Sequence, residues 1–152
     1  MPHRSRSPLA FIATALPLLW IGVVIGVSFL ATPAKFMAGP LDGALALSIS
    51  VVTFAWLHVT EAIFAAATVL VLIGLKAGVT RWLLLAVAVI ALALGADWVL
   101  PAFEGRTGLI PMLPLLDSKQ LHMAFAVLEG SKILALFALA YLGFRGSEPA
   151  ER

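Results

Sequence analysis

The sequence contains no cysteine, which excludes disulfide bonds, thiolate metal sites and cysteine nucleophiles. Charge is also scarce, because only 12% of the 152 residues are Asp, Glu, Lys or Arg and the net charge is +2. No stretch resembles a nucleophile triad, a phosphate-binding loop or a dinucleotide fingerprint. The few basic residues flank apolar segments, so the sequence predicts no nucleic-acid partner.

Apolar residues are abundant instead: 62% of the chain is hydrophobic and the mean hydropathy is +1.07. A soluble domain of this length cannot bury so much apolar surface, because small domains leave much of their surface in water. The composition therefore predicts a single integral membrane domain over residues 1–152, in contact with the lipid bilayer.

Four apolar runs follow one another along the chain, and each is long enough to cross a bilayer as a helix, which takes roughly 20 residues. They cover residues 9–31, 46–75, 82–100 and 120–142. The first run is longer than the apolar core of a signal peptide, which has about 7–15 residues, so we interpret it as a span that ends at Pro33. The predicted fold is all-α, a four-helix transmembrane bundle.

The distribution of basic residues predicts the orientation. If the N-terminus is cytoplasmic, six basic residues lie on that side of the membrane and three on the other. The first group is Arg4, Arg6, Lys76, Arg81, Arg145 and Arg152, and the second is Lys35, Arg106 and Lys119. The positive-inside rule therefore places both termini in the cytoplasm.

A weak internal repeat accompanies the four spans. Pro33 and Pro101 are 68 residues apart, and so are Glu61 and Glu129. Each half of the chain would be an outward span with a proline at its end and a returning span with a buried glutamate. Two such halves would be parallel two-helix repeats, related by an axis along the membrane normal. The other matches between the halves are those that an Ala- and Leu-rich composition gives by chance, so both interpretations stay open.

Ionisable residues lie inside two of the predicted spans. An ionisable group in hydrocarbon costs at least about 2.5–3.5 kcal/mol, so these side chains should face the bundle interior. They are predicted to form one buried polar site, which consists of His58, Glu61, His122, Glu129 and Lys132.

The pairing within this site has alternatives. Lys132 follows Glu129 at the i,i+3 spacing of a local ion pair, and the spacing of His58 and Glu61 is the same. His58 is expected to be a neutral imidazole that bonds to Glu61 or to a backbone carbonyl. Glu61 lacks a local cation, so it is either protonated or paired across the bundle with Lys132. The site is either a structural ion pair or a functional cavity.

Cofactors are not predicted. Haem could use His58 and His122, but their depths differ by about 6 Å, and haem ligands need nearly equal depth. Four-helix di-iron proteins use glutamates together with Glu-x-x-His motifs. This chain has a reversed His58-x-x-Glu61, a lone Glu129 and a neighbouring cation. Neither haem nor a metal fits the residues well.

A second polar cluster is predicted at the outer ends of the spans. Its members are Lys35, Asp97, Glu104 and Arg106. The alternative is that these residues only anchor the helices at the membrane interface.

Four stretches of the sequence together resemble an uncharacterised family of small bacterial four-span inner-membrane proteins. They are Trp20-Ile-Gly22, Phe29-Leu-Ala-Thr-Pro-Ala-Lys-Phe36, Leu100-Pro-Ala-Phe-Glu-Gly-Arg106 and His122-x-x-Phe-x-x-x-Glu129-x-x-Lys132. The chain departs from the family pattern at Val51, where a basic residue often stands, and at Phe125, where a tyrosine is common. The resemblance implies a bacterial inner membrane and four helices, and it implies no activity.

These observations favour a non-enzymatic inner-membrane protein whose buried polar site handles or senses a proton or a small solute. The alternative is an accessory subunit of a larger membrane complex, and a redox or lipid-processing enzyme is third. A homo-oligomer or a partner membrane protein is compatible with each of these functions.

Overall fold

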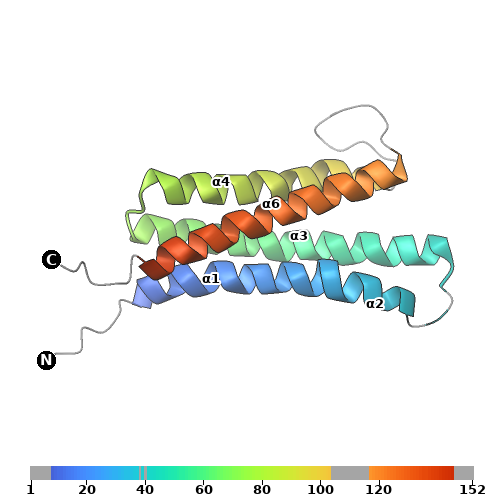
Figure 1. The fold of residues 1–152 in the computed structure, drawn as a ribbon, viewed down its shortest axis with the longest axis horizontal. Coiled ribbons are helices and arrows are strands. Elements are labelled where there is room, and N and C mark those ends of the chain that lie inside the picture. The colour runs from blue at the N-terminus through green and yellow to red at the C-terminus, as the bar shows by residue number, and fades with distance from the viewer. Residues whose placement is uncertain (1–7, 38, 40, 104–116, 146–152) are drawn as a thin grey trace, which may run out of the picture.

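The computed structural model describes residues 8–37, 39, 41–103 and 117–145, and all regular structure within these ranges is helical (Figure 1). Four helices are long and apolar enough to cross a membrane: Pro8–Lys35, Gly43–Gly74, Val79–Phe103 and Lys119–Arg145. In finer division the elements are α1 (Pro8–Ile25), η1 (Gly26–Ala31), α2 (Thr32–Met37), α3 (Gly43–Gly74), α4 (Val79–Leu94), η2 (Gly95–Val99), α5 (Leu100–Phe103) and α6 (Ser118–Arg145). The predicted all-α fold with four membrane-length helices is confirmed.

The first and third spans do not stop at their prolines, which corrects the prediction that Pro33 and Pro101 end them. Each proline lies just after a π-helical segment, η1 or η2. In these segments the N–H of Thr32 bonds to Val27 O and the N–H of Leu100 bonds to Gly95 O, five residues back. Proline has no N–H for the α-helical ladder and its ring crowds the preceding turn. The wider π turn absorbs this defect and lets the helix continue.

The helices form a four-cornered bundle. α6 packs against α1 and α4, and α3 packs against the same two helices, so α3 and α6 face each other across the bundle. Figure 1 shows α1 beginning and α6 ending at the same end of the molecule. Long side chains from α3 and α6 therefore meet on the bundle axis.

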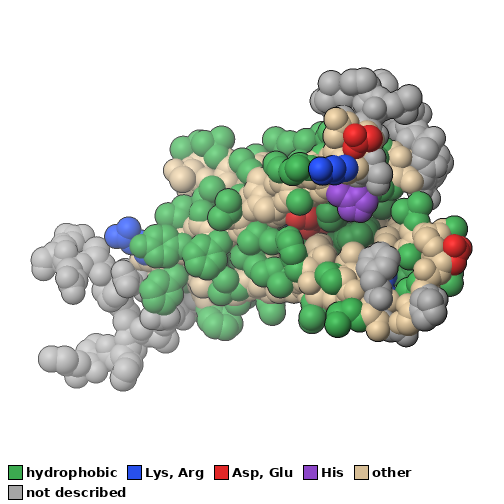
Figure 2. All heavy atoms as spheres, turned by 45° about the vertical axis from the view of Figure 1, so that its right-hand side comes forward, with side chains coloured by type: hydrophobic (Ala, Val, Ile, Leu, Met, Phe, Trp, Pro, Cys, Tyr) green, Lys and Arg blue, Asp and Glu red, His purple; other side chains and the backbone are tan. Residues whose placement is uncertain are grey.

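The outer surface of the bundle is apolar. Large hydrophobic side chains on every span are more than 60% exposed, among them Phe11, Leu30, Trp56, Ile63, Leu134 and Phe137. Hydrophobic atoms cover most of the face seen in Figure 2. Soluble proteins rarely expose apolar surface on this scale, and lipid chains are the natural cover for it. The fold is therefore that of a multi-pass membrane protein.

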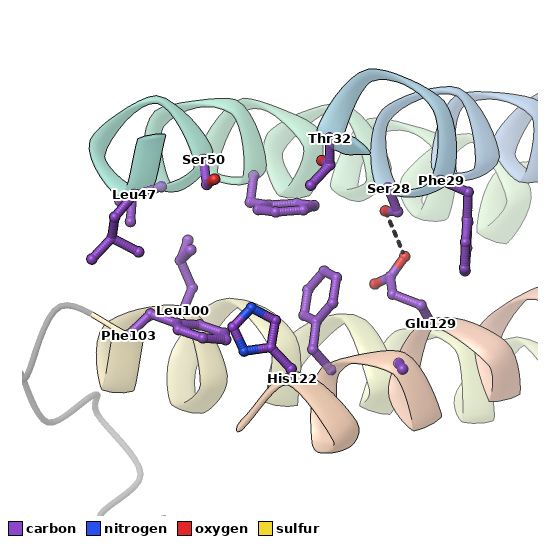
Figure 3. Close-up of a pocket in the computed structure, with 13 residues that line it drawn as sticks. Ser28, Phe29, Thr32, Leu47, Ser50, Leu100, Phe103, His122 and Glu129 are labelled. Carbon is purple, nitrogen blue, oxygen red and sulfur yellow. Dashed lines mark hydrogen bonds between the residues drawn. The ribbon is translucent and has the colours of Figure 1, made fainter. Parts of the chain in front are cut away.

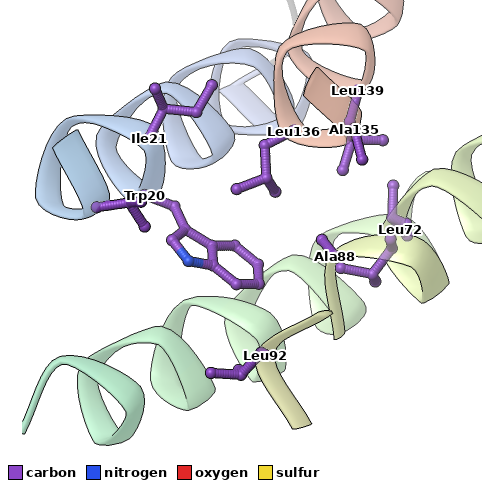
Figure 4. Packing of buried hydrophobic residues seen from close by; sticks show 10 residues of the cluster. Trp20, Ile21, Leu72, Ala88, Leu92, Ala135, Leu136 and Leu139 are labelled. Atoms are coloured by element: carbon purple, nitrogen blue, oxygen red, sulfur yellow. The ribbon is translucent and has the colours of Figure 1, made fainter. Parts of the chain in front are cut away.

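The half of the bundle that contains the start of α1 and the end of α6 is a packed apolar core (Figure 4). Its buried members are Trp20, Ile21, Val24, Leu72, Leu85, Ala88, Leu92, Ala135, Leu136 and Leu139. At this end α1 and α6 approach so closely that a Cβ added at Gly143 would lie 2.9 Å from Ala13 O and 2.8 Å from Thr14 Oγ1. A glycine is needed there because any side chain would push the helices apart.

Gly143→Ala is therefore expected to destabilise the bundle. The methyl group would collide with backbone, and overpacking of this kind costs about 1–3 kcal/mol. The measurement is thermal unfolding in mild detergent. The matched control is Gly130→Ala in the same helix, where no described heavy atom lies within 4 Å of the added Cβ. Because alanine has the better helix propensity, the control should be neutral or stabilising. Equal melting temperatures for the two variants would contradict the close helix contact.

Candidate functional site

A buried ion cluster joins α3 and α6 at the centre of the bundle. Lys132 Nζ lies 2.6 Å from Glu61 Oε1 and 2.7 Å from Glu129 Oε1. The three side chains are at most 2% exposed. The two pairings that the sequence left as alternatives, a local one to Glu129 and one across the bundle to Glu61, are thus both present. A single ammonium group is shared by two carboxylates.

The first span supplies two further donors to these carboxylates. The indole nitrogen Nε1 of Trp20 donates to Glu61 Oε1 over 2.9 Å, and the hydroxyl of Ser28 donates to Glu129 Oε2 over 3.3 Å. Sequence reasoning did not assign either residue to the site. For Trp20 a signal existed, because this tryptophan lies too deep in its span for the interfacial belt where tryptophan is enriched. Ser28 carried no comparable signal.

His58 lies beside the cluster but does not make the hydrogen bond that the sequence predicted. It is 7% exposed, and neither ring nitrogen has a partner among the described residues. The second carboxylate oxygen of Glu61, Oε2, is also buried and also lacks a hydrogen-bond partner among the described residues. A Cβ added at Gly95 would lie 3.4 Å from His58 Nε2, so the glycine lets the imidazole pack against η2. Buried polar atoms without partners are costly, and they mark this end of the cluster as a place for a proton or a polar ligand.

The π-helical segments lie at the cluster. Ser28 belongs to η1 and reaches Glu129, while Gly95 opens η2 and packs against His58. π-helical turns are frequent at functional sites, because they offset the helix register locally and re-aim side chains. Here each π-helical segment lies shortly before a proline, Pro33 or Pro101, and this proline explains why the segment occurs at that point in the sequence.

The charge of the cluster is unbalanced. Two ionised carboxylates and one ammonium leave one negative charge in a region that excludes water. A charged group buried without compensation in a low-dielectric medium changes its protonation state instead. The cluster becomes neutral if it binds one additional proton or one external monovalent cation.

Three of the residues also offer a conceivable metal site. One ligand atom each from His58, Glu61 and Glu129 lies within 4.8 Å of the others. However, Lys132 already binds an oxygen of each carboxylate. A divalent cation would lie beside the ammonium group or displace it. The donor set therefore fits a proton better than a metal ion, and the expectation of no bound cofactor stays a prediction.

A pocket of about 240 Å³ opens beside the cluster in the half of the bundle away from the described chain ends. It is lined by Ser28, Phe29, Thr32, Leu47, Ser50, Val51, Phe54, Leu100, Phe103, His122, Phe125, Ala126 and Glu129. In Figure 3 the Glu129 carboxylate points into the space between the helices. In Figure 2 acidic atoms are visible in a recess between hydrophobic and backbone atoms, close to a histidine.

His122 is not a buried member of the ion cluster, which corrects that part of the predicted site. It lies two helical turns before Glu129, about 10 Å along the axis. Its side chain is exposed and packs edge-to-face on Phe103, with ring centroids 4.8 Å apart. Depth along the helix therefore separates His122 from Glu129 and Lys132.

The predicted outer polar cluster stays a prediction. Lys35 at the end of the first span bonds to Ala46 O and to the Ser50 hydroxyl, so it ties α2 to α3. Asp97 lies in η2 and is partly exposed. Glu104 and Arg106 lie outside the described residues.

Comparisons with protein-family models, curated proteins and solved structures gave no match to this chain. The class of the protein therefore rests on its own features. It is a multi-pass, all-helical membrane protein with a polar cluster buried at the centre of its bundle.

Proposed function

We propose that the protein is a proton-handling membrane protein, in which the Glu61–Lys132–Glu129 cluster binds one exchangeable proton. Binding of this proton depends on what occupies the pocket beside the cluster. The observation that carries the proposal is the sharing of one ammonium by two carboxylates at 2.6 and 2.7 Å. This arrangement is one proton short of neutrality, and a buried group that gains or loses a proton is suited to coupling or sensing.

The proton would reside on Glu61 Oε2. Glu61 Oε1 already accepts bonds from Lys132 and Trp20, whereas both Glu129 oxygens have a donor. Oε2 of Glu61 has no partner in the described parts of the chain. A proton there would turn this oxygen into a hydrogen-bond donor, next to a histidine whose ring nitrogens also lack partners in the described residues.

Exchange of this proton would be one-sided. The apolar core fills the half of the bundle that contains the start of α1 and the end of α6. The pocket reaches Glu129 from the other half. The titratable groups at the cluster are His58 and Glu61 on α3 and Glu129 and Lys132 on α6. Among the described residues of the first span, Trp20 of α1 and Ser28 of η1 contact the cluster, and neither titrates. η2 carries Asp97, which is partly exposed. A site open to one side is typical of sensing or of one state of a transporter, not of a continuous channel.

Trp20 provides a built-in reporter for this proposal. In a variant that keeps Trp20 as the sole tryptophan, with phenylalanine at positions 56, 82 and 98, indole fluorescence should respond to the charge of Glu61. We expect emission from protein in lipid nanodiscs to follow a single-proton titration. Glu61→Gln should abolish this titration, because the indole then donates to a neutral amide at every pH.

The matched control for the titration is Asp42→Asn, which removes an exposed carboxylate just before the start of α3. It should leave the titration unchanged. Emission that stays constant with pH while the protein remains folded would overturn the proposal, as would a titration that survives in Glu61→Gln.

We further propose a bacterial inner membrane with both termini in the cytoplasm, on the basis of the basic residues and of the family resemblance. Because the chain lacks cysteine, a single introduced cysteine is the only residue of the chain that a thiol reagent can label. A cysteine at Gly108 should react with an impermeant maleimide added outside cells, and one at Ala77 should not. The opposite labelling would reverse the orientation, and the pocket would then open toward the cytoplasm.

A further inference from the structure

Apart from the His122 imidazole, the polar groups that line the pocket present more acceptors than free donors. The Thr32 hydroxyl donates to Val27 O over 2.9 Å, and the Ser50 hydroxyl donates to Ala46 O over 2.9 Å. The Ser28 hydroxyl donates to Glu129 itself. Each hydroxyl proton is thus directed to a carbonyl or carboxylate, so Ser28 and Thr32 can only accept from a ligand, and the Ser50 oxygen already accepts from Lys35. Such a lining suits a ligand that brings positive charge or donor groups, and it offers little to an anion.

The remaining walls are largely aromatic. Phe54 and Phe125 meet edge-to-face with ring centroids 4.8 Å apart, and Phe103 stacks in the same way on His122. Figure 3 shows Phe103 and His122 next to each other on the side of the pocket that also carries Glu129. Aromatic faces attract cations, and the interaction strengthens where water is excluded.

From these features we propose that the pocket binds a small lipophilic monocation, a protonated amine or quaternary ammonium with an apolar body, whose charge lies against Glu129. This inference rests on the proposed function, because the cation would supply the positive charge that the exchangeable proton otherwise supplies. Binding of one cation would release one proton from the cluster to the solvent, and no bond other than the O–H bond would break.

The charge and the volume of the pocket limit which ligands it can bind. An anion would face the Glu129 carboxylate, and Lys132 cannot compensate because it is already shared with Glu61. The Lys35 ammonium donates to Ser50, which lines the pocket, but Lys35 itself is not a lining residue. The volume of about 240 Å³ is below the roughly 300–1,000 Å³ of pockets for drug-sized ligands. A single ring with a compact cationic head is the expected scale.

The test uses three probes of nearly equal shape: phenyltrimethylammonium, its neutral isostere tert-butylbenzene and the anion phenyltrifluoroborate. Binding to the full-length protein in nanodiscs is measured by calorimetry, with empty nanodiscs as the control for partition into lipid. Proton release is followed with a pH indicator in weak buffer. We expect saturable binding of the cation, at least about tenfold tighter than either other probe, with about one proton released per cation.

Two variants locate the site. Glu129→Gln should weaken binding of the cation about tenfold or more and abolish proton release. Phe54→Leu should weaken binding while leaving the Trp20 titration intact, because it alters the wall and not the cluster. Asp42→Asn should match the unaltered protein in both measurements.

The proposal is overturned if the three probes bind alike, if the anion binds best, or if Glu129→Gln binds the cation normally. It also fails if the cation binds without proton release. A normal Trp20 titration together with no cation binding would reject this inference and leave the proposed proton function standing. Loss of the titration would reject both.

Discussion

Lys132→Met should be the most damaging single substitution in the ion cluster, with an expected loss of about 3–5 kcal/mol at neutral pH. Removing the ammonium leaves Glu61 and Glu129 facing each other with the cation between them gone. Their oxygens are as deeply buried as before, so neither carboxylate can recover its hydration. The measurement is thermal unfolding in mild detergent at several pH values.

The pH dependence of this variant follows from proton counting. Without the ammonium, both carboxylates must hold protons in the folded state, so the folded protein binds more protons than the unfolded one at neutral pH. Its stability should therefore rise as the pH falls. The control is Lys119→Met, an exposed lysine at the start of the same helix, which should change stability little at any pH. Equal effects of the two substitutions would show that Lys132 does not neutralise the cluster.

The second large effect is expected when both carboxylates are removed together. Glu61→Gln and Glu129→Gln should each be mild, about 1 kcal/mol, because Lys132 keeps one carboxylate and the cluster stays neutral without the additional proton. The double variant strands the ammonium in the bundle and should lose about 3–5 kcal/mol. The excess over the sum of the single effects is the coupling energy of the shared lysine.

A third substitution checks the origin of this coupling. Adding Lys132→Met to the double variant removes the stranded charge, so stability should recover in part. Additive single effects would instead mean that Lys132 serves one glutamate alone. So would a single variant as damaging as the double variant.

The sequence predicted the local part of this site and missed the part that depends on tertiary contacts. The Glu129–Lys132 pair follows from spacing within one helix, so it could be predicted. The contact of Lys132 with Glu61 across the bundle was only one of two alternatives that the sequence left open for Glu61. Spacing within a helix does not say which helices face each other, nor at what relative depth.

The same distinction holds for the fold. Apolar runs of membrane length predicted the four helices, because the bilayer itself imposes that pattern. The continuation of the spans beyond Pro33 and Pro101 was not predictable from a rule that treats proline as a terminus. In lipid the backbone must stay hydrogen-bonded, so a π turn that preserves the helix is favoured over a break. The proposed two-helix repeat stays a prediction, although both halves carry a π segment before the proline.

The central claim is that the Glu61–Lys132–Glu129 cluster is held neutral by one additional proton, and infrared spectroscopy tests it most directly. A protonated carboxyl group has a carbonyl stretch that a carboxylate lacks. Isotope labelling of glutamate assigns that band to glutamate side chains. At neutral pH we expect one buried protonated glutamate in the unaltered protein, none in Glu61→Gln or Glu129→Gln, and two in Lys132→Met. A spectrum without a protonated carboxyl band in the unaltered protein, or with the same band in all four proteins, would contradict the account.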